Sequence, residues 1–193
     1  MSLYVFVRIV ITIIFLFFVL VFTIKKVAIK KRQPYLIWTI LLVFSLSSLL
    51  YFFPFENIFV SFKTPESAAF YYNNYDTIDV IYGQDSCLVI SENNSSKKQQ
   101  ILIKDDEGWK IKTGFSIKTI AQQSNNLNYL KIMNVNGSQD TYISIINIFG
   151  DNVDIQDKYN THFKKTEPGH YYGYLSNYSE GYSITINSIE IKF

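Results

Sequence analysis

The sequence predicts a membrane α-helical hairpin joined to a mainly-β (α+β) extracytoplasmic domain, an antiparallel meander or sandwich-like fold with one short helix. Two long apolar runs occupy the first 53 of the 193 residues. The short link between these runs is strongly basic. Beyond residue 59 the chain becomes polar, and short segments alternate apolar with polar residues, which is typical of half-buried strands.

The two apolar runs predict two membrane spans. Residues 3–24 hold 22 residues with a single charge, Arg8, and residues 35–53 hold 19 residues without a charge. A helix rises about 1.5 Å per residue, so either run is long enough for a hydrocarbon layer of about 30 Å. A cleaved signal peptide would have a shorter apolar stretch of about 7–15 residues. Neither run has the polar face that a helix packed on a soluble core would show.

The link between the spans predicts their orientation. Residues 25–33 are too few to recross a membrane, so the spans are antiparallel neighbours. Five residues of the link are basic, namely Lys25, Lys26, Lys30, Lys31 and Arg32. Short loops rich in Lys and Arg remain cytoplasmic. We therefore expect a multi-pass protein of the cell membrane with both termini extracytoplasmic, and we expect Arg8 to extend to the outer lipid headgroups.

The charge distribution indicates which class of partner to expect, and the cysteine content indicates the compartment. Residues 1–56 carry six basic groups and one acidic group, a net charge of +5. Residues 57–193 carry twelve lysines and fifteen acids, a net charge of −3, and the two parts add to the +2 of the whole chain. The outer part is therefore mildly acidic, and no nucleic-acid partner is expected. The single cysteine, Cys87, excludes an intramolecular disulfide, which suits a bacterial cell surface.

Residues 57–115 predict a short helix followed by a four-strand antiparallel meander. Thr64 is a typical N-cap before Pro65, so a helix is expected over residues 65–73. Four strand-like segments follow, separated by turn-forming residues. They contain Ile78, Val80 and Tyr82; the CLVI run of residues 87–90; Ile101 and Ile103; and Trp109 and Ile111.

Residues 116–193 predict a β-rich region, which belongs either to the same domain or to a second one. The polar stretch 114–128 is the expected separator. Strands are expected over residues 129–134, 141–149 and 170–175.

The end of the chain predicts a hairpin with a defined register. A turn at Asn187 and Ser188 pairs Ile186 with Ile189 and Ile184 with Ile191. All four isoleucines then share one face, whereas a straight strand would divide them between two faces.

Several short segments follow one another along the outer region: TPES, DSCLVI, GWKI, YNTHF and YSITINSIEIKF. With these segments, residues 64–193 resemble uncharacterised small membrane-anchored proteins of Gram-positive bacteria. The resemblance implies placement outside the cytoplasm and implies no activity.

The sequence contains no set of residues typical of a catalytic centre. Its only histidines are His162 and His170, and no G-x-S-x-G motif is present. Cys87 lies in an apolar strand, which favours a buried thiol over a nucleophile. No glycine-rich phosphate loop occurs, so no cofactor and no catalytic activity are expected.

An acidic loop is the candidate metal site. It contains Asp151, Asp154 and Asp157. Calcium prefers such oxygen ligands, but the alternation of an EF-hand loop is absent, and a solvated acidic loop is the more common structure.

A group of tyrosines is the candidate binding surface. It contains Tyr171, Tyr172, Tyr174 and Tyr178. Aromatic side chains bind glycans or peptides through rigid amphipathic faces, but they also pack on half-buried strands, where tyrosine is favoured.

These observations favour a membrane-anchored extracytoplasmic binding or interaction module without catalytic activity. Its expected partners are the lipid bilayer and a protein or another component of the cell surface. One alternative is a structural subunit of a larger membrane complex. A second alternative is a cation-dependent membrane-tethered hydrolase built on the acidic loop.

Overall fold

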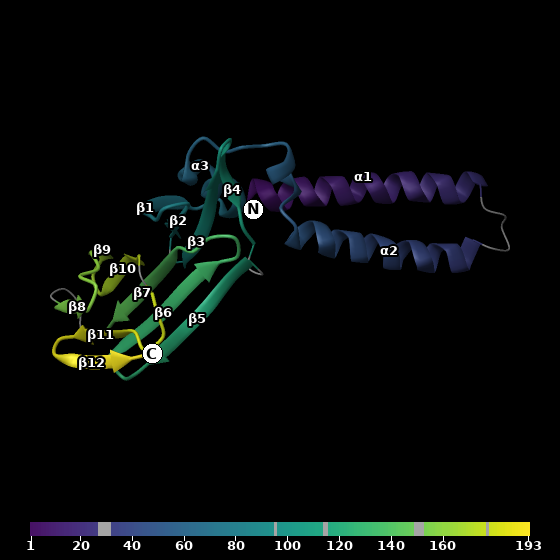
Figure 1. Ribbon diagram of the computed structural model, residues 1–193. Coiled ribbons are helices and arrows are strands. Elements are labelled where there is room, and N and C mark those ends of the chain that lie inside the picture. Colours follow the sequence, from purple (N-terminus) through teal and green to yellow (C-terminus); the bar gives the residue numbers. More distant parts are fainter. Residues whose placement is uncertain (27–31, 95, 114–115, 149–152, 177) are drawn as a thin grey trace.

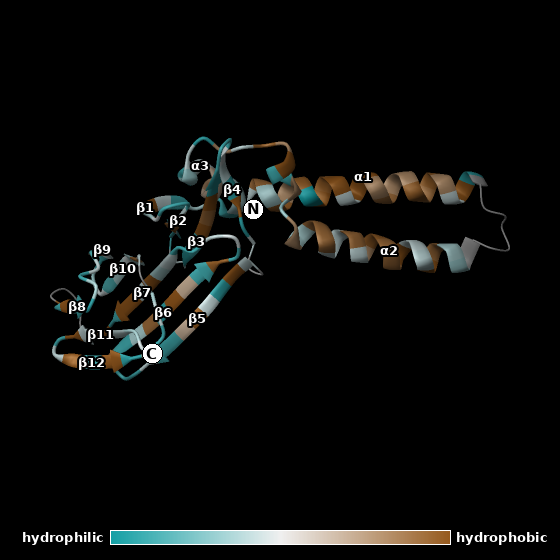
Figure 2. Cartoon of the chain, viewed as in Figure 1, coloured by the Kyte–Doolittle hydropathy of each residue, from teal (hydrophilic) through white to brown (hydrophobic). Residues whose placement is uncertain are grey.

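The computed structural model describes residues 1–26, 32–94, 96–113, 116–148, 153–176 and 178–193. Two long antiparallel helices, α1 (Leu3–Lys26) and α2 (Arg32–Phe52), lie side by side and extend from a β-rich body (Figure 1). Both are long and apolar enough to cross a membrane. Only 6% of the most apolar stretch of each helix is buried, so apolar side chains cover the outside of this hairpin (Figure 2).

A short helix connects the hairpin to the first sheet, as the sequence predicts. A 3-10 turn, η2 (Phe55–Ile58), precedes α3 (Pro65–Asn73). The Thr64 hydroxyl accepts a hydrogen bond from the Ser67 backbone N–H at 3.2 Å, which caps the first turn of α3. Asn74 ends this helix in the left-handed conformation, with φ of 57°.

The first sheet confirms the predicted meander. It contains β1 (Asp76–Tyr82), β2 (Ser86–Asn93), β3 (Ser96–Asp105) and β4 (Gly108–Ile111), antiparallel and in the order β1-β2-β3-β4. The CLVI run lies in β2, and both faces of this strand are covered. Cys87 and Val89 pack with α3, whereas Leu88 and Ile90 pack against the second sheet. Burial on both faces explains why this run shows no alternation.

The prediction that a polar stretch separates two regions is wrong, because this stretch contains a strand of the second sheet. Its strands are β5 (Ile117–Ser124), β6 (Asn128–Val135), β7 (Thr141–Asn147), β9 (Phe163–Glu167) and β10 (His170–Leu175), in the order β5-β6-β7-β10-β9. The polar stretch expected to divide two regions therefore contains β5. This edge strand pairs only with β6 and exposes most of its side chains, so it needs no apolar alternation.

The third sheet confirms the predicted terminal hairpin. It contains β8 (Ile155–Asp157), β11 (Ser183–Ile186) and β12 (Ile189–Lys192), in the order β12-β11-β8. Ile184 pairs with Ile191 and Ile186 with Ile189. Asn187 and Ser188 adopt φ values of 48° and 68°, as a two-residue hairpin turn requires. The strands β8 and β9, which are three and five residues long, were not predicted.

The layers follow the order α3, first sheet, second sheet, third sheet. Leu88, Ile90 and Ile101 of the first sheet share one buried cluster with side chains of the second. The opposite face of the second sheet packs on the third sheet through another cluster, which includes Ile143 and Ile184. Residues 57–115 and 116–193 therefore share apolar packing, and together they form the body carried by the hairpin.

Candidate functional site

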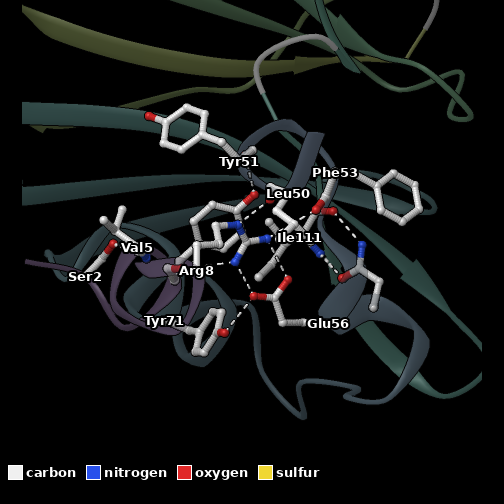
Figure 3. Close-up of polar contacts among 11 residues, drawn as sticks. Ser2, Val5, Arg8, Leu50, Tyr51, Phe53, Glu56, Tyr71 and Ile111 are labelled. Carbon is white, nitrogen blue, oxygen red and sulfur yellow. Dashed lines mark hydrogen bonds and ion pairs between the residues drawn. The ribbon is translucent and has the colours of Figure 1, made fainter. Parts of the chain in front are cut away.

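A buried polar cluster lies where the hairpin meets the β-rich body (Figure 3). We call Arg8, Glu56 and Tyr71 the junction. They come from the second turn of α1, from η2 and from α3. Arg8 and Glu56 are each only 5% exposed. Arg8 Nη2 donates to Glu56 Oε2 at 2.8 Å, and Nη1 donates to Glu56 Oε1, so the ion pair is bidentate.

Arg8 also binds the carboxyl end of α2. Its Nε donates to the carbonyl of Leu50 at 2.5 Å, and Nη2 donates to the carbonyl of Phe53 at 3.2 Å. A fifth bond runs from Nη1 to the carbonyl of Tyr4 at 3.0 Å. The five N–H groups of the guanidinium thus have five acceptors. The carbonyl of Leu50 lies in the last turn of α2, where carbonyls lack helical partners and a cation is favourable.

The expectation that Arg8 extends to the lipid headgroups is therefore wrong. A carboxylate 48 residues further along the chain and the carbonyls at the end of α2 satisfy the guanidinium inside the protein. The sequence did contain a signal for this pairing. Glu56 is the single acid among the first 56 residues, and Arg8 is the single charge within the first predicted span.

Aromatic rings enclose the ion pair. The guanidinium carbon of Arg8 lies 3.2 Å from the ring centroid of Tyr4 and 5.0 Å from that of Phe55. Tyr4 is 2% exposed and packs edge-on against Tyr71 and Tyr72 of α3. Cation–π contact and burial strengthen the attachment of α1 to α3.

The charge state of Glu56 follows from these contacts. Burial raises the pKa of this carboxyl. Hydrogen bonds from Arg8, the backbone and Tyr71 lower this pKa by a larger amount, so the net shift is downward. Tyr71 donates its hydroxyl to Glu56 Oε1 at 2.8 Å. Burial and this carboxylate raise the pKa of Tyr71 to about 12. The junction is consequently a neutralised pair with an ionised Glu56, suited to holding two parts of the chain together.

The segment after α2 is bound to β4 as well. The Asn57 side chain donates to the carbonyl of Ile111 at 2.8 Å and accepts from its N–H at 2.9 Å. Thr113 donates its hydroxyl to the carbonyl of Phe52 at 2.8 Å. These bonds join the end of the hairpin to the first sheet, so the connection is a packed joint.

The predicted acidic loop is only partly described. Asp151 lies outside the described residues. Asp157 accepts hydrogen bonds from the hydroxyls of Thr161 and Tyr182 at 2.6 and 2.9 Å, and Asp154 accepts bonds from the Gln156 side chain. Among the residues that the structure describes, no group of three His, Cys, Asp or Glu side chains is placed to hold a metal. The metal site remains a prediction.

The four predicted tyrosines do not share one surface. Tyr171 and Tyr172 are consecutive residues of β10, so they face opposite sides of the second sheet and enter different clusters. Tyr178 packs near Tyr182, with ring centroids 5.9 Å apart. Tyr174 donates its hydroxyl to Asp140 at 2.9 Å. Packing within the fold therefore covers most of the surface of these four tyrosine side chains.

Three of the predicted topology residues lie in helix ends remote from the β-rich body (Figure 1). Lys25 and Lys26 end α1, and Arg32 begins α2. Lys30 and Lys31 lie outside the described residues.

A groove lies between β1 and the segment that leads into β9. Its cavity measures about 400 Å³. The side chains that define this tyrosine groove are Tyr82, Tyr159, His162, Lys164 and Tyr174. Tyr82 is 56% exposed, and Lys164 Nζ pairs with Asp79 Oδ1 at 2.6 Å. Of these residues only Tyr174 belongs to the predicted binding surface, because the groove joins strands distant in sequence.

No protein-family model matches the chain, and neither a curated protein nor a solved structure is significantly similar to it. The resemblance to small membrane-anchored proteins of Gram-positive bacteria therefore stays a prediction.

Proposed function

We propose that this protein is a membrane-anchored binding or interaction module, without catalytic activity, that presents its β-rich body outside the cytoplasm. The junction is the observation that carries this proposal. A bidentate buried ion pair and the bonds around Asn57 attach the body to the hairpin. Such a joint holds a binding domain at a defined position relative to a membrane.

The distribution of charge on α1 supports lipid as the surroundings of the hairpin. Arg8 is 5% exposed, whereas the neighbouring Phe6 and the more distant Phe18 are 48% and 66% exposed. A helix in water would place apolar side chains inside and charges outside. The reverse arrangement is typical of a membrane segment, in which ionisable side chains face the protein interior.

The basic link supports the orientation. The ends of α1 and α2 that this link joins lie at the opposite end of the hairpin from the β-rich body (Figure 1). Short basic loops remain cytoplasmic, so the body and both termini are placed outside the cell membrane.

The tyrosine groove supports a binding role. It combines the exposed ring of Tyr82 and the half-buried rings of Tyr159 and Tyr174 with the polar side chains of His162 and Lys164. Ligand sites commonly join apolar and aromatic walls to a few polar groups. We infer that a protein or another component of the cell surface binds there.

Cysteine labelling tests the orientation. In a Cys87→Ser background, one cysteine is placed at the exposed Gln122 of β5 and, in a second variant, at the exposed Lys25. A membrane-impermeant maleimide is expected to label position 122 in intact cells and position 25 only after permeabilisation. The opposite pattern would place the β-rich body in the cytoplasm and overturn the proposal.

Photo-crosslinking tests the binding role. A photoreactive residue at Tyr82 or His162 in the groove is expected to yield discrete adducts in intact cells. The same residue at Gln122, which is exposed but remote from the groove, is the matched control and should yield none. Adducts confined to the exposed Phe44 of α2 would instead favour the structural subunit of a membrane complex.

A further inference from the structure

The segment between α2 and α3 exposes apolar side chains and buries its one acid, Glu56. Phe53, Ile58, Phe59 and Val60 are 59%, 67%, 79% and 44% exposed, and we call them the apolar strip. Glu56, within the same segment, is 5% exposed. This is the reverse of the pattern expected for a connector in water, where the acid would face solvent.

The backbone that carries the apolar strip is held in place. Phe59 and Val60 donate their N–H groups to the carbonyl of Glu56 at 2.9 and 2.7 Å. The Asn57 side chain exchanges two hydrogen bonds with Ile111, and Phe62 exchanges two backbone bonds with Trp109. The apolar side chains therefore point outward from a fixed segment.

The junction sets the height of the strip relative to the hairpin. Because Arg8 and Glu56 are in contact, η2 lies beside the second turn of α1 (Figure 3). Arg8 is five residues into the helix from Leu3, which is about 7.5 Å along its axis. If α1 spans the bilayer, η2 lies at the depth of the outer membrane boundary rather than above it.

We propose that the apolar strip is a third membrane contact, inserted into the outer lipid interface, which seats the β-rich body directly on the bilayer. The inference rests on the proposed function, since it requires the hairpin to be inserted. Lipid is the partner that covers the apolar strip, because the strip adjoins the exposed apolar surface of α2 and lies at the same depth as the end of that helix. Aromatic side chains are favoured at this interface.

Spin labelling of the full-length protein in liposomes tests the inference. In the Cys87→Ser background, a nitroxide is attached at Phe59→Cys, or at Ile58→Cys if that variant does not fold. Two controls replace apolar residues of similar exposure: Phe18→Cys in α1, 66% exposed, and Ile148→Cys after β7, 71% exposed. The measured quantity is the relative accessibility of each label to oxygen, which enriches in lipid, and to a water-soluble nickel chelate.

We expect the label at position 59 to favour oxygen, as at position 18, and the label at position 148 to favour the nickel chelate. If position 18 favours oxygen and position 59 favours nickel, the strip faces water and the inference fails, while the inserted hairpin stands. If position 18 itself favours nickel, the proposed anchor fails. Low accessibility to both reagents at position 59 would indicate cover by protein and would also overturn lipid contact.

Discussion

Replacing Glu56 by glutamine is expected to lower the free energy of unfolding by about 3–5 kcal/mol, because it leaves the buried guanidinium of Arg8 without a counter-charge. The measurement is denaturant unfolding of the detergent-solubilised protein. The buried Trp109 serves as the fluorescent reporter in a Trp38→Phe background. The matched control, Glu180→Gln at an exposed position, should change stability by less than about 0.5 kcal/mol.

A double variant separates the net contribution of the pair from the penalty of an unpaired charge. Arg8→Met with Glu56→Leu is expected to recover most of the stability lost in Glu56→Gln, because replacing both charges with apolar side chains is often nearly neutral. A Glu56→Gln protein as stable as the wild type would show that the junction does not hold the body to the hairpin. A double variant no better than the single one would show that the hydrogen bonds of Arg8 to the helix end dominate.

The second large effect is expected at Asp140, which joins the first two sheets. This 2% exposed carboxylate accepts bonds from the backbone N–H groups of Gln84, Asp85 and Ser86 and from two hydroxyls. Both bonds from Ser86 are buried, and each buried donor left without a partner costs about 1–3 kcal/mol, so Asp140→Ala is expected to lose about 2–6 kcal/mol. The same unfolding measurement checks it. Asp106→Ala, at an exposed turn, is the control, and equal losses in both variants would contradict the assignment.

The charge of Asp140 also predicts a dependence on pH. Burial raises the pKa of this carboxyl, but bonds from Gln84, Ser86, Asp85 and Tyr174 lower it below its usual value. Its contribution to stability is therefore complete above an unfolded pKa of about 3.9 and is lost as the pH falls through the lower folded pKa. Unfolding curves from pH 7 to pH 2 should show a smaller loss of stability on acidification in Asp140→Asn than in the wild type. Identical slopes would exclude this role.

Much of the fold could be predicted because its signals are local. The Thr64-Pro65 start predicts α3, and the pairing of isoleucines across Asn187 and Ser188 predicts the register of the terminal hairpin. Length and hydropathy alone predict α1 and α2 as candidate spans. The edge strand β5 was missed because an exposed strand needs no apolar face, and β8 and β9 are too short to show a pattern.

The candidate sites depended on contacts between distant segments. Asp157 has the ligand chemistry of a metal site, but its oxygens accept bonds from Thr161 and Tyr182. The tyrosines of β10 are neighbours in the chain and lie on opposite faces of a sheet. The tyrosine groove brings Tyr82 of β1 beside residues 159–164. No local pattern encodes that proximity.

The sequence by itself determined the two apolar helices, the basic link between them and the antiparallel β character of the remainder, because hydropathy and periodicity act over a few residues. Only the tertiary structure decided that Arg8 turns inward to Glu56, and that residues 53–60 expose apolar side chains while burying their acid. The physical reason is that a buried charge depends on a counter-charge close in space, here 48 residues away in the chain.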